Sequence, residues 1–395
     1  MMAMHPNNPD TILAATSGGI FKTTDGGNSW TRTSSNTDHY KDLRLKPGDP
    51  NIAYTTEGGN FYRSANNCDS WSFVSNGLSN NTRMVIGVTP ADPSVVYCVL
   101  TSGTFVGLFK STDSGLSFTN MSGNNPTNIM GYTDGDNLSQ AWYDLCVAVS
   151  PTNADQVYIG SINIHRTNNS GSSFTKLTNW HNLTPLEPVH ADQHIMEFSP
   201  VNGALYVGND GGVYKTTSSG SDWTDISNGL GIAQAYRLGQ SATEQQKVIN
   251  GYQDNGVGLY DNGSFTTVTG GDGMESVIDY SNSNYIYSTY ATTIMRSSNG
   301  GNSFFDIAGQ GINGITESGA WVLPYILHET DPNTLFAGYR NIWRTNNVRS
   351  GNPNFSKISN SLGGTNNVDM RAIEQSPADV SVLYASRYDL SLIHI

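Results

Sequence analysis

Lys22-Thr23-Thr24-Asp25-Gly26-Gly27-Asn28-Ser29-Trp30 is the clearest copy of a pattern that occurs seven times in this chain. Each copy has a basic residue, then Ser or Thr, and then a turn that leads to an aromatic residue. Neighbouring copies mostly lie about forty to sixty residues apart, a spacing typical of small structural units stacked on one another. The other copies begin at Arg63, Lys110, Arg166, Lys215, Arg296 and Arg344.

The segment 191–226 indicates how one unit folds. It contains four short runs suited to β-strands, separated by turns rich in Pro, Gly, Asn and Asp. The run Asn209-Asp210-Gly211-Gly212 favours a hairpin, because Asp-Gly and Gly-Gly reach positive φ at little cost. Four short antiparallel strands per unit make the blade of a β-propeller. The expected strands cover residues 193–198, 204–208, 213–216 and 222–226.

The same scheme predicts an all-β propeller of four-stranded antiparallel blades, with eight units and part of a ninth. The sixth unit, around Lys247 to Phe265, lacks the basic and hydroxyl pair. Segment 119–141 is rich in Asn and Gly and too long for an ordinary turn, so we expect an insertion loop at one end of the ring. Strands such as 95–100 are apolar on both faces, which suits blades packed face to face.

Both ends of the sequence carry expectations of their own. Residues 1–4 run directly into the repeat at Pro6, so we expect the natural N-terminus to lie upstream. The ninth unit is expected to begin at Pro377 and to stop within its second strand. The tail 391–395 resembles a translated sequencing adapter and is a candidate artefact, which leaves 1–390 as the propeller, either one ring or parts of two.

Composition restricts the function classes. The chain of 395 residues has a formal net charge of −13, which argues against nucleic acid and anionic membranes as partners because both attract Lys and Arg. It has no apolar run of about 18 residues that could span a bilayer, and no secretory signal precedes the first repeat. Its three cysteines form neither a disulfide framework nor a CxxC metal site. We expect no cofactor.

The turns match the pattern Ser/Thr-x-Asp-x-Gly-x-x-Trp/Phe of the Asp-box, or BNR repeat. In each turn the short polar side chain is expected to cap backbone N–H groups, Gly takes positive φ, and the aromatic ring packs between blades. These residues are therefore predicted to be structural. The full matches are Thr23, Asp25, Gly27 and Trp30, and Ser111, Asp113, Gly115 and Phe118.

Through these turns the chain resembles the Asp-box β-propellers of sortilin/VPS10-like proteins and of xyloglucanase-type glycoside hydrolases. The resemblance implies a secreted or cell-surface protein. It leaves two functions open, a glycoside hydrolase acting on a polysaccharide such as xyloglucan, or a non-catalytic binding propeller for a peptide or polysaccharide. A photosystem assembly propeller is a third interpretation that no motif favours. A sialidase is disfavoured because the Arg-Ile-Pro motif of those enzymes is missing.

The topology of a propeller sorts the polar residues of the chain. Residues just before a first strand, and residues in the turn from second to third strand, lie at the same face, whereas the Asp-box turns lie at the opposite face. One mouth near the axis is therefore expected to collect carboxylates, imidazoles and aromatic rings, as ligand sites do. The residues assigned to this mouth are Tyr143, Asp144, His190, Asp192, His194, Asp210, Gln253, Asp254, Asn255, Asp272, Glu275 and Trp321.

Two chemical hypotheses follow for this mouth. In an extended segment His190, Asp192 and His194 would point the same way and could hold a divalent metal, or they could form a hydrogen-bonded plug. Asp254 and Asp272 are the best carboxylates for general acid and base catalysis, since glycosidases use two carboxyls that flank the sugar linkage. The alternative is that both simply belong to favourable turns.

Overall fold

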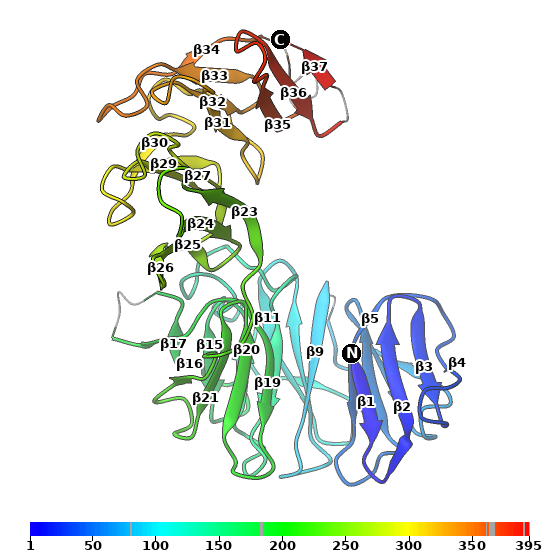
Figure 1. Cartoon of the computed structure of the whole chain (residues 1–395). Helices are drawn as coiled ribbons and strands as arrows, with labels where there is room; N and C mark the ends of the chain where they lie inside the picture. Colours follow the sequence, from blue (N-terminus) through cyan, green and yellow to red (C-terminus); the bar gives the residue numbers. More distant parts are fainter. Residues whose placement is uncertain (80, 182–184, 361, 363–367, 390–391, 395) are drawn as a thin grey trace. The chain divides into compact units, whose positions relative to one another are not determined.

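The protein is built from β-strands arranged as propeller blades (Figure 1). The computed structural model describes residues 1–79, 81–181, 185–360, 362, 368–389 and 392–394. Within these ranges no helix is long and apolar enough to cross a bilayer. Nine sheets, each joining its strands in chain order with antiparallel neighbours, are the blades, and the predicted all-β propeller fold is thus confirmed. The chain divides into two compact units, Met1–Leu230 and Gly231–Ile395.

Unit 1 contains blades one to five and a small parallel pair of strands. Blades one and two are β1 (Met2–His5), β2 (Asn8–Thr16), β3 (Gly19–Thr23) and β4 (Thr31–Arg32), then β5 (Tyr40–Leu45), β6 (Ala53–Glu57), β7 (Asn60–Ser64) and β8 (Ser72–Val74). Blades three and four are β9 (Arg83–Val88), β10 (Val96–Thr101), β11 (Phe105–Ser111) and β12 (Thr119–Asn120), then β13 (Cys146–Val149), β14 (Val157–Gly160), β15 (Ile164–Thr167) and β16 (Thr175–Lys176). The parallel pair and blade five are β17 (Thr178–Asn179) and β18 (Glu187–Pro188), then β19 (Gln193–Phe198), β20 (Leu205–Asn209), β21 (Gly212–Thr216) and β22 (Thr224–Asp225).

Unit 2 contains blades six to nine. Blades six and seven are β23 (Ala235–Gln240), β24 (Lys247–Tyr252), β25 (Gly256–Asp261) and β26 (Ser264–Thr269), then β27 (Gly273–Ile278), β28 (Ile286–Tyr290), β29 (Thr293–Ser297) and β30 (Phe305–Ala308). Blades eight and nine are β31 (Tyr325–Leu327), β32 (Leu335–Gly338), β33 (Ile342–Thr345) and β34 (Ser356–Lys357), then β35 (Met370–Gln375), β36 (Leu383–Arg387) and β37 (Leu392–His394).

The fifth unit shows how closely the strands follow the sequence pattern. Its first strand, β19, has the predicted limits, and the other strands differ by one or two residues at their ends. The hairpin between β20 and β21 forms at Asp210 and Gly211, as expected. In this hairpin the positive φ, 137°, falls on Gly212, and Asp210 and Gly211 keep negative φ.

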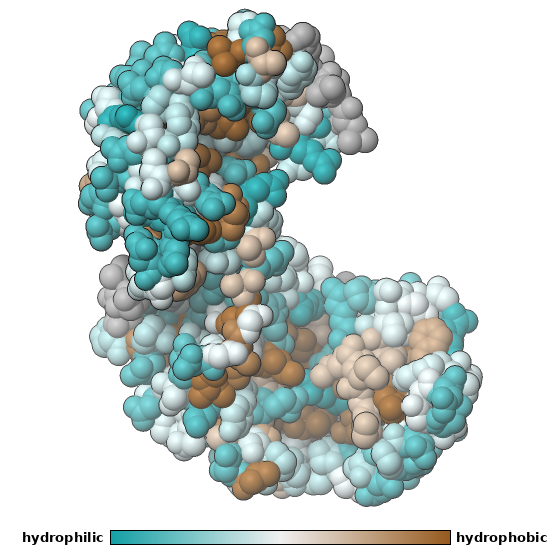
Figure 2. Space-filling model, viewed as in Figure 1, coloured by the Kyte–Doolittle hydropathy of each residue, from teal (hydrophilic) through white to brown (hydrophobic). Residues whose placement is uncertain are grey.

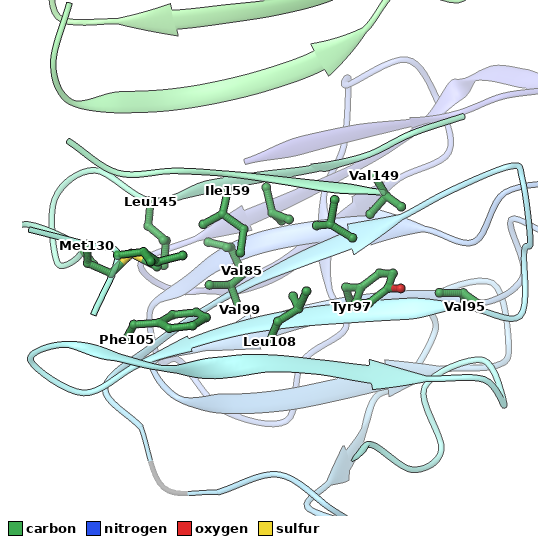
Figure 3. Packing of buried hydrophobic residues seen from close by; sticks show 14 residues of the cluster. Val85, Val95, Tyr97, Val99, Phe105, Leu108, Met130, Leu145, Val149 and Ile159 are labelled. Atoms are coloured by element: carbon green, nitrogen blue, oxygen red, sulfur yellow. The ribbon is translucent and has the colours of Figure 1, made fainter. Parts of the chain in front are cut away.

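Blades pack face to face through apolar side chains. All six residues of β10 are buried, which confirms the expectation for strands that are apolar on both faces. Figure 3 shows side chains of blade three, among them Val85, Tyr97 and Leu108, pointing toward Leu145 and Ile159 of blade four. Burial of such side chains on both sides of a sheet supplies the main driving force for stacking the blades.

The first strands line the inner side of each unit, as the topology predicts. In unit 1, residues of β5, β9, β13 and β19 line an open cavity of about 430 Å³. In unit 2, residues of β23, β27, β31 and β35 line an open cavity of about 390 Å³. In the view of Figure 2, apolar residues gather along the inner strands of unit 1, whereas its outer rim is mostly hydrophilic.

The repeated turn is held by its own side chains. The Thr23 hydroxyl accepts a hydrogen bond from the N–H of Gly27 at 3.0 Å, and Asp25 Oδ1 accepts one from the N–H of Ser29 at 2.9 Å. Gly27 has φ of 96°. Hydrogen bonds from Ser29 and Thr23 lower the pKa of Asp25 to about 2. These contacts are the predicted structural role of the turn.

The aromatic residue of the turn packs between two blades only where the chain has a blade before its own. Phe118 of blade three is 5% exposed and lies edge-on to Phe61 of blade two, with ring centroids 5.0 Å apart. Trp30 of blade one is 39% exposed and instead donates from Nε1 to the carbonyl of Gly27 at 3.1 Å. The expected packing therefore fails for Trp30, because the ring of each turn packs on the blade before it.

In four copies of the repeat, at Lys22, Arg63, Arg166 and Arg296, the basic residue donates a cross-blade hydrogen bond to a backbone carbonyl. Its side chain leaves the third strand of one blade and reaches the repeated turn of the next. The accepting carbonyl belongs to a residue with φ of 57° or 58° in the three clearest cases. These bonds run from Lys22 Nζ to Asn67 O at 2.7 Å, from Arg63 Nε to Ser114 O at 2.8 Å, and from Arg166 Nη1 to Ser219 O at 2.6 Å.

Blade six departs from the repeat where the sequence predicts it. A two-residue hairpin at Asn262 and Gly263, with φ of 48° and 89°, replaces the repeated turn. The outer strand β26 has six residues, whereas outer strands of the other four-stranded blades have two to four. The loss of the basic and hydroxyl pair therefore accompanies a different outer edge.

The insertion at 119–141 packs onto blades three and four. The Asn128 side chain accepts from the N–H of Phe105 at 3.0 Å, and the Met130 carbonyl accepts from Ser161 Oγ at 3.3 Å. Asn128 and Met130 are buried, so the insertion adds to the core of unit 1.

The ninth blade begins earlier than the sequence pattern suggests. Its first strand, β35, starts at Met370 and not at Pro377, because the turn that contains Pro377 joins the first strand to the second. Residues 392–394 form a third strand paired with β36, so the blade does not stop within its second strand. Residues 390, 391 and 395 of the tail lie outside the described ranges.

Ser111→Ala tests the role of the repeated turn. The buried hydroxyl of Ser111 accepts from the N–H of Gly115 at 2.9 Å, so its loss leaves that N–H without an acceptor. We expect the free energy of unfolding, measured by urea denaturation, to fall by about 1–2 kcal/mol. The exposed neighbour Thr112→Ala should change it by less than about 0.5 kcal/mol. Equal effects of the two substitutions would contradict the assigned role.

Candidate functional site

The predicted mouth residues of unit 1 come together at one end of blades four and five. Tyr143 and Asp144 precede β13, His190 and Asp192 precede β19, and Asp210 lies in the hairpin between β20 and β21. In this unit, the residues that precede the first strands therefore lie beside the hairpin between the second and third strands, as expected.

His194, Asp210 and Tyr143 form a hydrogen-bonded group. His194 Nε2 lies 2.7 Å from Asp210 Oδ1, and the Tyr143 hydroxyl donates to Asp210 Oδ2 at 3.0 Å. The Tyr143 and His194 rings meet edge to face, with centroids 4.8 Å apart. Both carboxylate oxygens of Asp210 are thus engaged, and the Tyr143 ring stays 40% exposed beside them.

Asp144 and Asp192 form a carboxyl pair. Asp144 is fully buried and accepts from Ser161 Oγ at 3.2 Å, whereas Asp192 is partly exposed and accepts from Gln140 Nε2 at 3.0 Å. Burial and the charge of Asp192 raise the pKa of Asp144 to about 8. Oδ2 of Asp144 is buried and has no N–H or O–H donor among the described residues, so a proton on this oxygen, donated to Asp192, satisfies both groups.

The metal hypothesis required the segment 190–194 to be extended, and in the structure it is not. Asp192 has φ of 67°, and β19 begins only after it, at Gln193. A Cβ on Gly211 would lie 2.2 Å from the His190 ring, so that ring rests against the hairpin backbone. Asp192 interacts with Asp144, and His194 lies against Asp210. The extended backbone that the metal hypothesis assumed is therefore not formed, and metal binding itself stays a prediction.

Unit 2 brings together Asp254 and Asp272. Asp254 lies in the turn between β24 and β25 with φ of 59°, and its N–H donates to Asp272 Oδ1 at 3.1 Å. Asp272 directly precedes β27. The predicted neighbourhood of these two residues is therefore present.

An exposed aromatic ring is connected to the same turn. The Tyr236 hydroxyl donates to Gln253 Oε1, and Trp321 Nε1 donates to the Tyr236 hydroxyl at 3.4 Å. Trp321 is 48% exposed. Asn255 Nδ2 donates to the carbonyl of Gln253 at 3.0 Å, which fixes the turn. The indole, the phenol and the amide thus form one hydrogen-bonded chain, and Gln253 directly precedes Asp254 in the sequence.

Glu275 lines the inner cavity of unit 2. Burial raises its pKa to about 7, although the Arg237 guanidinium, with Nε 3.4 Å from Glu275 Oε2, opposes this shift. Its carbonyl accepts from the Tyr325 hydroxyl at 3.0 Å. A carboxyl with a pKa near 7 can both donate and accept a proton near neutral pH.

Sequence reasoning missed several residues of these two groups. Gln140, Ser161 and Tyr236 carry no motif, and only the three-dimensional structure places them beside the carboxyls. Trp142 could have been found, because it directly precedes the predicted Tyr143. Its side chain is 73% exposed and its ring centroid lies 5.7 Å from that of Tyr143.

Comparison with known proteins gives one curated relative. A xyloglucanase of Hypocrea jecorina (strain QM6a) is 25% identical over 267 residues, a match that covers 63% of this chain and 27% of the relative. The match thus spans about a quarter of the relative's length. No family model matches the sequence.

Solved structures show likeness of fold. A crystal structure of an ancestral GH74 enzyme aligns with a TM-score of 0.59 at 15% identity, covering all of this chain and 70% of that one. A GH74 enzyme of Niastella koreensis gives a TM-score of 0.42 at 16% identity, covering 98% of this chain and 69% of that one. The first of these supports the propeller fold, and at this identity it shows nothing further.

Asp144→Asn tests the shared proton. The pKa of Asp144 rises from 3.8 to about 8 on folding, so its contribution to stability is fully present below pH 4 and is lost as the pH rises through 8. An Asn side chain mimics the protonated acid at every pH. We expect the free energy of unfolding of the unmodified protein to fall, relative to that of Asp144→Asn, between pH 5 and pH 8 in urea titrations. The exposed Asp306→Asn should leave the pH dependence unchanged, and an unchanged profile in Asp144→Asn would refute the shared proton.

Proposed function

We propose that this chain is a carbohydrate-directed propeller, and specifically a glycoside hydrolase that acts on a β-glucan such as xyloglucan. The observation that carries the proposal lies in unit 2, where Trp321, Tyr236 and Gln253 form a hydrogen-bonded chain. Gln253 directly precedes Asp254, whose N–H donates to Asp272. Aromatic faces stack on the C–H faces of sugars, and amides and carboxylates bind their hydroxyls. The curated relative, named a xyloglucanase, supports the same substrate class.

Asp254 and Asp272 are the proposed acid and base. Hydrolysis of a glycosidic bond requires one carboxyl to donate a proton to the leaving oxygen as the bond to the anomeric carbon breaks. In an inverting reaction a second carboxylate takes a proton from the water whose oxygen attacks that carbon. Gln253, Asn255 and Trp321 would hold the sugar, and Glu275 lies farther along β27.

The group of unit 1, taken by itself, also has the chemistry of a glycan contact. Tyr143, His194 and Asp210 offer a hydroxyl, an imidazole and a carboxylate beside the exposed ring of Trp142. His190 and Asp192 lie beside this group, with the His190 ring against Gly211 and Asp192 at Asp144. Since polysaccharides of this kind lie outside cells, we place the protein in the secreted or cell-surface class.

The alternative is a non-catalytic, sortilin-like or adhesive propeller that binds a peptide or polysaccharide. One contact favours it. Asp272 accepts the N–H of Asp254, a use that fixes the turn and requires no proton transfer. Such a hydrogen bond can stabilise a non-catalytic binding surface just as it can position a catalytic residue.

Asp254→Asn and Asp272→Asn decide between the two functions. If the pair is catalytic, each change should lower the rate of release of reducing ends from xyloglucan by about 10²–10⁴-fold, the range for losing an acid or base. Asp306→Asn, an exposed Asp of unit 2, is the control and should keep full activity. Activity that survives both changes would remove these residues from the mechanism. Binding of glycans without any release of reducing ends would establish the alternative.

Trp321→Ala tests the stacking surface. The side chain is 48% exposed, so its loss should leave the fold intact and raise the KM for a xyloglucan oligosaccharide by about two- to tenfold. Phe305→Ala, which removes a 65% exposed ring elsewhere in unit 2, should not change the KM. Equal effects of the two substitutions would show that Trp321 has no special contact with the ligand.

A further inference from the structure

A second pocket of unit 1 lies at the starts of four first strands. Its volume is about 250 Å³, and residues of β5, β9, β13 and β19 form its walls. Apolar side chains such as Val85 and Met196 line part of it. His194 is the one residue that it shares with the group of Asp210 and Tyr143.

Positive side chains predominate in this pocket. Lys41, Arg44 and Arg83 line it together with a single carboxylate, Asp42. This ratio is unusual in a chain with 33 acidic and 20 basic residues. The three cations lie together because they come from two neighbouring first strands, β5 and β9, and not because the chain is rich in basic residues.

The one carboxylate of the pocket is already occupied. Asp42 accepts from the N–H of Ile86 at 2.6 Å and from the N–H of Leu43 at 2.9 Å, and its Oδ1 lies 3.2 Å from Arg44 Nε. Asp42 is buried, so it cannot turn toward Lys41 or Arg83 without breaking these bonds. Its charge also acts on Arg83, but one carboxylate against three cations leaves the lining net positive.

Two guanidinium nitrogens have no acceptor in the parts of the chain that the structure describes. Arg83 uses Nη1 to donate to the carbonyl of Ala141 at 2.7 Å, and Arg44 uses Nη1 to donate to Glu197 at 3.1 Å. Nη2 of each side chain donates to none of the described residues, and neither Nη2 is among the buried unpaired atoms. Each of these two side chains, which line the pocket, thus keeps N–H groups that no described residue accepts.

We infer that this pocket binds the carboxylate of an acidic sugar, such as a uronate residue of a polysaccharide. Guanidinium groups form charge-assisted hydrogen bonds with carboxylates, and Lys41 at the exposed rim adds a further positive charge. The apolar part of the wall suits the C–H face of one sugar ring. The choice of a sugar rests on the proposed function, and it extends the ligand class from neutral to acidic glycans.

Calorimetric titration with two matched probes tests this inference. Methyl glucuronide and methyl glucoside differ only in the carboxylate, and the glucuronide should bind about tenfold more tightly or better. Acetate, which lacks the ring, should bind more weakly than the glucuronide. Equal affinity for the two glycosides would overturn the inference, and acetate that binds as tightly as the glucuronide would overturn the assignment to a sugar.

Variants locate the binding. Lys41→Gln and Arg83→Gln should each weaken glucuronide binding about tenfold, whereas Arg371→Gln, which removes an exposed cation at the inner cavity of unit 2, should not. Lys41 is exposed, so Lys41→Gln should fold and still tests binding at this pocket if Arg83→Gln does not fold. Unchanged binding in Lys41→Gln, or an equal loss in Arg371→Gln, would refute the site.

The outcome separates this inference from the proposed hydrolysis. A protein that cleaves xyloglucan and does not prefer the glucuronide would overturn the acidic-sugar site alone. A protein that binds the glucuronide at Lys41 and cleaves no glycan would overturn the hydrolase and support this site.

Discussion

The cross-blade hydrogen bond fixes how one blade is aligned on the next wherever the repeated turn receives it, whereas apolar burial drives the stacking itself. A Lys or Arg on the third strand of one blade reaches a carbonyl of the next repeated turn, as Arg63 does at Ser114. The positive φ of the accepting residue turns that carbonyl toward the cation. Lys22 and Arg296 are less than a tenth exposed, and a buried cation is stable only when such acceptors surround it. The turn therefore has two functions, since it closes its own blade and holds the charge of the preceding one.

The sequence predicts most of the fold because the pattern of one unit is local. Hydroxyl, Asp and Gly at fixed spacing close a turn, and the end of β19 follows from the turn with Pro200 and Gly203 that succeeds it. The role of the basic residue was missed, because its acceptor lies on another blade. The start of the ninth blade was misplaced for a related reason, since Pro377 stands in a turn that resembles the beginning of a unit.

The candidate sites were predictable as neighbourhoods but not as chemistry. Topology brings Asp210 to His194 and Asp254 to Asp272. It does not reveal that Asp192 adopts a left-handed backbone and lies beside Asp144, where burial and the second acid raise the pKa of Asp144 to about 8. Environment thus gives carboxyls of similar sequence context different roles, with Asp144 neutral and buried and Asp210 fully engaged by neighbours. Such differences arise from contacts between separate loops, which no single motif encodes.

The short hairpin of blade six has a practical consequence for protein engineering. Where a repeated turn receives a cation from its neighbour, as at Ser114, lengthening the loop would displace the accepting carbonyl and leave a charge without its partner. The loop at Asn262 and Gly263 has no repeated turn to preserve. A peptide tag or a foreign loop spliced there would leave the series of contacts among the other blades untouched, which makes this edge the natural position for attaching a fluorophore or an immobilisation handle.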